Sequence, residues 1–127
     1  MHKSRLAGFI IDCNTDDLER SAQFWSAALG YALRPLAKEG DPEKYRELLT
    51  GEEGLKVEVQ RVDHASRVHL DIETDDIEAE VRRLEQLGAK RVAEFPRWCV
   101  MEAPAGQRFC VVRVQREDFA EHANVWK

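Results

Sequence analysis

The sequence predicts an α+β fold built from two tandem β-α-β-β-β modules. The main observation is an internal repeat: Phe9–Glu19 returns 59 residues later as Val68–Glu78, and such repeats usually mark duplicated structural units. In each copy a strand-like stretch leads into apolar residues at helical spacing. We expect one domain over residues 1–127, with module one at about 5–63, module two at about 65–115 and a tail at 116–127.

The two opening strands differ in how regularly polar and apolar residues alternate. The second copy alternates as a strand with one buried face should, with Val68, Leu70 and Ile72 toward its helix and His69, Asp71 and Glu73 opposite. The first copy is less regular, with Phe9, Ile11 and Cys13 on one side and Ile10, Asp12 and Asn14 on the other. Alignment of the copies places His69 opposite Ile10, and this mismatch bears on function.

A helix is predicted after each opening strand. Asp16-x-x-Glu19 and Asp75-x-x-Glu78 are typical of an N-cap followed by an acidic first turn. Both apolar stripes stop at a Leu-Gly pair, at residues 29–30 and 87–88, where glycine suits a left-handed C-terminal position. We expect these stripes to pack on the sheet.

Strand character returns after each helix. The first copy predicts strands at 31–35, 45–50 and 55–62, and the second at 90–95, 98–102 and 108–114. The tail could form a short helix, with Phe119 and Trp126 docking either on the body of the chain or on a partner subunit. The sequence leaves that choice open.

Composition narrows the class of protein. The net charge of −5 argues against a nucleic-acid partner, because such proteins usually carry a basic face. The sequence has neither an apolar run of membrane-spanning length nor a signal-peptide core, so no membrane partner is expected. The three cysteines form no CxxC pair, which favours a reduced, cytoplasmic protein. His2 and His122 lie in the terminal segments and are expected to be solvated.

Several segments in the right order resemble the vicinal oxygen chelate superfamily, which includes glyoxalase I, bleomycin-resistance proteins and extradiol dioxygenases. They are Asp17–Trp25 with Leu29–Tyr31, Val68–Ile72 with Leu87–Ala89, and Trp98–Val112. The last segment is similar to the closing hairpin of the glyoxalase-like domain subgroup, with Ala103 and Gln107 as departures. The resemblance covers roughly residues 6–114 and implies an incomplete barrel around a cleft, and often a homodimer.

The resemblance also implies where a metal would bind. Metal-dependent members carry ligands on the first and last strands of each module, which correspond here to Ile10, Glu58, His69 and Cys110. Isoleucine cannot bind a metal, so the four-ligand set is broken. The remaining carboxylate, imidazole and thiol are a set that zinc accepts. Strand parity puts these three on the face opposite the apolar side chains.

The same face suggests a ligand site. His69 and Glu58 are the candidate catalytic residues. His69 is the candidate general acid or base, because imidazole exchanges protons near neutral pH. The candidate ligand-binding residues are Ile10, Asp12, Gln60, Asp71, Arg108 and Val112. Asp12 and Asp71 have an alternative structural role, since short polar side chains near strand ends often bond to turn backbone. Such a mixed lining suits a small polar-aromatic ligand or a short acyl compound.

Two hypotheses follow. The favoured one is a metal-independent protein that binds a small molecule in the cleft between the modules, without a cofactor. The alternative is a lyase, isomerase or dioxygenase-like enzyme that uses Glu58, His69 and Cys110 around zinc, nickel, iron or manganese. The loss of a donor at Ile10 favours the first, and the three surviving donors keep the second open.

Overall fold

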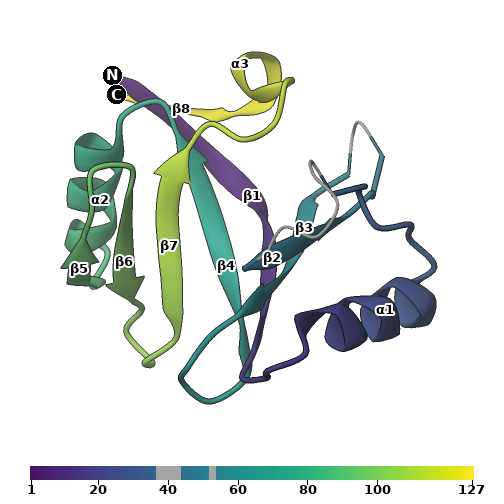
Figure 1. The fold of residues 1–127 in the computed structure, drawn as a ribbon. Coiled ribbons are helices and arrows are strands. Elements are labelled where there is room, and N and C mark those ends of the chain that lie inside the picture. Colours follow the sequence, from purple (N-terminus) through teal and green to yellow (C-terminus); the bar gives the residue numbers. More distant parts are fainter. Residues whose placement is uncertain (37–43, 52–53) are drawn as a thin grey trace. The chain divides into compact units, whose positions relative to one another are not determined.

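The computed structural model describes residues 1–36, 44–51 and 54–127 of the chain (Figure 1). Its elements are β1 (His2–Cys13), α1 (Leu18–Leu29), β2 (Tyr45–Leu48), β3 (Lys56–Arg61), β4 (Arg67–Thr74), α2 (Ile77–Gln86), β5 (Lys90–Glu94), β6 (Trp98–Glu102), β7 (Arg108–Arg113), α3 (Phe119–His122) and β8 (Asn124–Trp126). The described part of the chain is therefore mixed α+β and rich in strands, as predicted.

The chain forms two compact units. Unit 1 consists of Met1–Gly8 and His69–Lys127, and unit 2 is the continuous segment Phe9–Val68. Strand β1 therefore contributes its first part to unit 1 and its remainder to unit 2. Unit 2 corresponds roughly to predicted module one, whereas unit 1 adds the N-terminal residues and the tail to predicted module two.

Unit 2 is organised around α1 and the strand order β2-β3-β1. Strands β2 and β3 are antiparallel, with Glu47 opposite Glu58 in the register. The core of the unit consists of Cys13, Leu18 and Val59, with Ile11 and Trp25 packed against it. Because Val59 is buried on the helix side, its neighbours Glu58 and Gln60 belong to the opposite face of β3, as strand parity predicts.

Unit 1 places α2 on one face of a sheet in which β4 pairs in parallel with β7, and β7, β6 and β5 continue antiparallel (Figure 1). The helix-side core consists of Val81, Leu84, Cys99, Met101 and Val111. Alternate residues of the same strands therefore form a second face, turned away from α2. We call it the open face: it carries His69, Asp71, Glu73, Cys110, Val112, Arg108, Val100, Trp98 and Glu102.

The tail docks on unit 1 of its own chain, which is one of the two possibilities that the sequence left open. Strand β8 pairs antiparallel with the start of β1, where His2 is opposite Trp126. The Trp126 indole N–H donates to Ser4 Oγ at 2.8 Å, and the Arg83 guanidinium lies 3.9 Å above the ring. Phe119 is buried.

Two buried glutamates tie the N-terminal residues to the rest of unit 1. Glu80 of α2 is fully buried and accepts hydrogen bonds from Arg83 and from the His2 ring. Burial raises the pKa of the Glu80 carboxyl, but these hydrogen bonds outweigh it and leave the pKa below its ordinary value. The expectation that His2 is solvated was wrong, since its side chain is 10% exposed and paired with Glu80.

Glu73 of β4 is the second buried glutamate. Its Oε2 accepts from the Nε atoms of Arg5 at 2.8 Å and Arg116 at 3.1 Å, and its Oε1 accepts from the backbone N–H groups of Gln115 and Arg116. Burial raises the pKa of this carboxyl, yet the four hydrogen bonds hold the pKa below its ordinary value.

Two local predictions are corrected by the structure, and a third is confirmed. Residues 31–35 form no strand: Leu33 makes only an isolated bridge with Leu48, and Pro35 has no N–H to extend the pairing. The N-caps are Asp17 and Asp76, one residue later than predicted, and each accepts from the backbone N–H three residues on. The predicted glycine ends are confirmed, with φ of 77° at Gly30 and 107° at Gly88.

The helix-facing side of β4 was also predicted too broadly. Ile72 packs against the core of unit 1, but Val68 and Leu70 are 59% and 43% exposed. The core of the helix side is formed with β6 and β7, and the start of β4 lies outside it.

None of the helices in the described ranges is long and apolar enough to cross a membrane.

Candidate functional site

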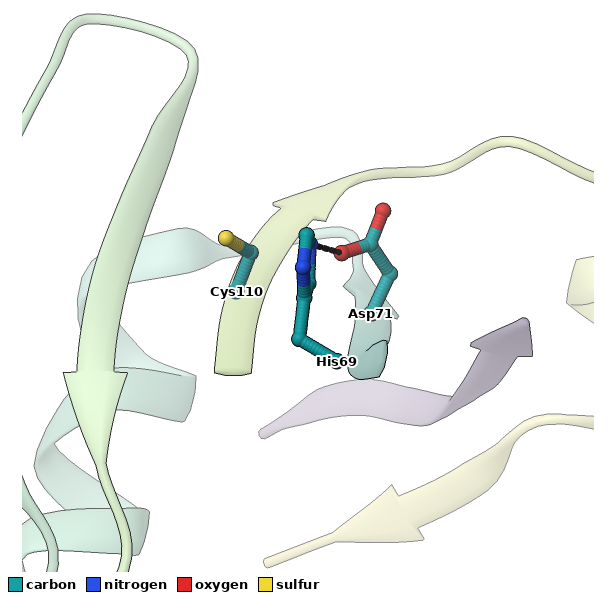
Figure 2. A group of neighbouring side chains, drawn as sticks. All are labelled: His69, Asp71 and Cys110. Carbon is teal, nitrogen blue, oxygen red and sulfur yellow. Dashed lines mark ion pairs between the residues drawn. The ribbon is translucent and has the colours of Figure 1, made fainter. Parts of the chain in front are cut away.

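The candidate site lies on the open face of unit 1, where β4 and β7 run side by side. His69 and Asp71 are two residues apart on β4, so both side chains point to the same face. Cys110 of β7 is opposite Asp71 in the parallel register. Figure 2 shows the three side chains gathered there, with an ion pair between His69 and Asp71.

The geometry of this cluster is close. His69 Nε2 lies 3.4 Å from Asp71 Oδ1, and the side chains are 12% and 17% exposed. One ligand atom from each of His69, Asp71 and Cys110 lies within 4.8 Å of the other two. Asp71 Oδ1 is buried and accepts no hydrogen bond from the part of the chain that the structure describes. It therefore has capacity to accept a hydrogen bond or to bind a cation, beyond its ion pair with His69.

The cluster also fits a metal by its chemistry. Imidazole nitrogen, carboxylate oxygen and thiolate sulfur are the three kinds of ligand that zinc takes in proteins. Tetrahedral zinc with bonds of 2.0–2.3 Å would place its donors about 3.5 Å apart. The His69–Asp71 separation already meets that spacing, and the 4.8 Å limit leaves only a small side-chain movement for Cys110.

The structure places the predicted ligand Glu58 in unit 2, on β3. Its Oε1 lies 2.9 Å from Lys56 Nζ, and its side chain is 14% exposed. The three donors that gather in unit 1 thus include Asp71, which the sequence indicated only as a ligand-binding residue. The roles predicted for Glu58 and Gln60 stay predictions.

Ile10 and Asp12, the predicted ligand-binding residues of β1, belong to unit 2 and are 4% and 2% exposed. Asp12 Oδ2 lies 3.7 Å from Arg67 Nε. The repeat therefore pairs each of its equivalent aspartates with a basic residue, arginine for Asp12 and histidine for Asp71. Their ligand-binding roles are not tested by these contacts.

Arg108 and Val112 are on β7, two residues to either side of Cys110 and on the same face. Arg108 Nε lies 3.4 Å from Glu102 Oε1 of β6, so its charge is shared within the face. Val112 is opposite Trp98 in the register. The structure thus brings His69, Asp71, Cys110, Arg108 and Val112 onto one face of one unit.

Sequence reasoning missed two features of this face. Asp71 was not recognised as a metal donor, although its i, i+2 spacing from His69 was a sufficient signal. Trp98 was not considered as a site residue, although it alternates with Val100 on a strand that pairs with β7.

Comparison with known proteins identifies the family. A family model for the glyoxalase-like domain matches residues 8–112. No curated protein matches the chain. Among solved structures, methylmalonyl-CoA epimerase from Mycobacterium tuberculosis has a TM-score of 0.61 at 16% identity, covering 91% of either chain. A hypothetical protein from Bacillus halodurans has a TM-score of 0.60 at 12% identity, covering 90% of this chain and 96% of the other.

A third structural neighbour is homoprotocatechuate 2,3-dioxygenase from Brevibacterium fuscum, with a TM-score of 0.58 at 15% identity. The match covers 90% of this chain but 37% of the dioxygenase chain. At these identities the neighbours show a shared fold alone. They agree with the α+β glyoxalase/bleomycin-resistance fold that the sequence predicts. The family match over residues 8–112 shows that the chain belongs to the glyoxalase-like domain family.

Proposed function

We propose that this protein binds a small molecule at the open face of unit 1, with the His69–Asp71 pair as the polar anchor. The observation that carries the proposal is the buried Asp71 oxygen next to an imidazole that can gain or lose a proton near neutral pH. A ligand hydroxyl could donate the hydrogen bond that Asp71 Oδ1 does not accept from the described part of the chain. The family supports this class of function, since its fold is used both to bind small molecules and to transform them.

The favoured form of this proposal needs no metal. In that form His69 donates to or accepts from the ligand, and Asp71 holds the imidazole in place through their 3.4 Å contact. Cys110 then serves as a small, weakly polar part of the binding surface. The same His69 would act as a general acid or base if the ligand were also transformed.

A second candidate is a divalent-metal site formed by His69, Asp71 and Cys110, favoured by the closeness of their ligand atoms. Bound there, a divalent ion would polarise two adjacent oxygens of a substrate as a Lewis acid. The three side chains would hold the ion, and Asp71 would exchange its pairing with His69 for a metal bond. This version replaces Glu58 of the predicted ligand set by Asp71.

Metal content separates the two candidates. The wild type, His69→Ala and Cys110→Ser are purified untagged from medium containing zinc, nickel, iron and manganese, and measured by elemental mass spectrometry. His64→Ala is the matched control, because this exposed histidine lies outside the cluster. Near-stoichiometric metal that is lost in the two cluster variants but retained in the control would establish the metal candidate.

If the protein is folded and contains no metal, the metal-independent binding proposal remains. Thermal-shift measurements with candidate ligands then test it. A panel of short acyl compounds and hydroxylated aromatics is screened against the wild type, since a ligand of the folded state raises the melting temperature. We expect at least one compound to shift the wild type and not His69→Ala. If no compound or metal shifts the melting curve, or if every shift survives His69→Ala, the proposed site is wrong.

A further inference from the structure

The outer side of α1 carries an exposed apolar stripe. Leu18 and Ala22 are buried on the inner side of the helix, toward the core of unit 2. Phe24, Ala27 and Ala28 are exposed, and their spacing of three and four residues puts them together on the opposite side. Phe24 is the largest member of the stripe and is 61% exposed. An apolar helix face of this kind is typical of a surface that a partner covers.

The stripe combines one large side chain with two small ones. The Phe24 ring contacts the Trp25 ring edge-on, at 5.0 Å between centroids, and is thereby supported from one side. The methyl side chains of Ala27 and Ala28 allow a second helix to approach closely. A face that presents a ring beside small residues is complementary to a copy of itself, provided that each ring meets the small residues of the other copy.

An antiparallel arrangement of two copies meets that condition. Phe24 and Ala28 are each two residues from Ser26, so a two-fold axis level with Ser26 sets Phe24 of each copy against Ala28 of the other. The same contact then forms twice, as in any interface with two-fold symmetry. A parallel pair would instead place the two Phe24 rings against each other and leave the small residues without a partner ring.

The charges at the two ends of α1 also fit the antiparallel arrangement. Arg20 is in the first turn, where the helix dipole does not favour a cation, and it forms no ion pair with another residue of the described ranges. The last turn contains no basic residue. The N–H groups of Gly30 and Tyr31 both donate to the Ser26 carbonyl, so they do not serve the carbonyls of residues 27–29. Antiparallel packing brings Arg20 of each copy to the last turn of the other, where the dipole attracts a cation.

We propose that the outer face of α1, formed by Arg20, Phe24, Ala27 and Ala28, is an interface with a second copy of this chain, in which the two helices pack antiparallel. This inference is independent of the proposed ligand site, because α1 belongs to unit 2 and the open face to unit 1. Two helices of 12 residues bury less area than a standard interface, so the dimer should be weak and concentration-dependent.

Sedimentation velocity over about 5 to 500 µM protein tests the interface, a range suited to weak association. The samples are the wild type, Phe24→Lys, Ala28→Lys and Leu87→Lys. Leu87 is the matched control, because it is 66% exposed and ends the helix of the other unit. We expect the wild type and the control to dimerise alike. Phe24→Lys and Ala28→Lys should raise the dissociation constant by about thirtyfold or more, because each dimer loses two central contacts.

The direction of the helices is tested through Arg20. Arg20→Glu should raise the dissociation constant about tenfold, because it places two carboxylates at the negative ends of the helices. Arg20→Lys should dimerise like the wild type. Arg82→Glu is the matched control: it changes the net charge equally, on α2, at a side chain that is 71% exposed. Circular dichroism confirms that the variants, all at exposed positions, keep the fold.

The outcomes decide between this occupant and others. A wild type that stays monomeric over the whole range overturns the proposal. If that monomer sediments with vesicles of phosphatidylcholine and phosphatidylglycerol, and Phe24→Lys does not, the face belongs to a membrane surface instead. A dimer that Phe24→Lys and Ala28→Lys leave unchanged forms elsewhere and also overturns the proposal. Equal weakening by Arg20→Glu and Arg82→Glu would reflect general charge repulsion and overturn the antiparallel arrangement.

Discussion

Replacing Glu73 by glutamine should destabilise the protein substantially, although the change conserves shape. Glu73 is fully buried, and its Oε2 accepts from two guanidinium groups, those of Arg5 and Arg116, whose side chains are 10% and 14% exposed. Glutamine keeps one oxygen for the backbone N–H groups of residues 115 and 116. Its NH₂ group, however, cannot accept from either arginine, so two charge-assisted hydrogen bonds are lost.

The loss of unfolding free energy in Glu73→Gln depends on which other contacts Arg5 and Arg116 keep. Arg5 keeps its 2.6 Å contact with Asp118, and Arg116 still donates to the Leu6 carbonyl at 2.7 Å. Neither charge is left unpaired, so the cost should lie at the lower end of the range for broken buried ion pairs, about 3 kcal/mol. For a chain of this length that corresponds to a fall in melting temperature of about 10 °C.

The assay is urea unfolding of the wild type, Glu73→Gln and Glu78→Gln across a range of pH. Glu78 is the matched control, because its side chain is 49% exposed and its ion pairs with Arg82 and Arg91 are solvated. We expect the control to lose about 0.5 kcal/mol.

The pH dependence gives a second, independent check. The folded-state pKa of Glu73 is lowered, so its stabilising contribution is complete above the ordinary glutamate pKa of 4.5 and disappears as the pH falls through the folded-state value. The gap between wild type and Glu73→Gln should therefore be constant near neutral pH and shrink in acid. A variant as stable as the wild type at neutral pH, or a gap that stays unchanged in acid, would refute this reasoning.

Three further substitutions test other parts of the fold by the same unfolding measurements. Trp126→Ala should cost about 2 kcal/mol, because it removes the Arg83 contact and the hydrogen bond to Ser4; a negligible loss would mean that the tail is not docked. Met101→Ala should cost about 3 kcal/mol, since this side chain is fully buried in the core of unit 1. Asp76→Ala should cost about 1 kcal/mol through loss of the N-cap, whereas Asp75→Ala, outside that cap, should leave the helix content of α2 unchanged.

The repeat explains why so much of the fold could be predicted. Each element is encoded by signals within about a dozen residues. Polar and apolar residues alternate in the strands, a capping aspartate marks the start of each helix, and a glycine marks its end. The error at the N-caps arose because each turn contains two consecutive aspartates, and the sequence does not show which one precedes the first helical residue. In the structure Asp75 instead accepts from the backbone N–H of Lys3, a contact between distant residues.

The parts of the fold and of the site that the sequence did not predict depend on contacts between residues that are distant in the chain. The ion pair of Glu73 with Arg116 was not predicted, because nothing local in the sequence indicates that the tail covers Glu73. The site was predicted in part for the same reason. Strand parity placed His69, Asp71 and Cys110 on one face, but only the parallel register of β4 with β7 shows that Asp71 and Cys110 are neighbours. The position of Trp98 on this face depends on two such registers in succession.

The division of β1 between the two units has a consequence for the order in which the protein can fold. Unit 2 is one uninterrupted stretch of chain, whereas unit 1 must recruit Met1–Gly8 from across the whole of Phe9–Val68. Ribosomal synthesis therefore delivers the first strand long before its partner β8 exists. Because His2 and Trp126 are neighbours in the register, a short linker could join the two ends of the chain. A circular permutant opened between the exposed residues His64 and Ala65 would make unit 1 continuous, and it should fold faster than the natural order.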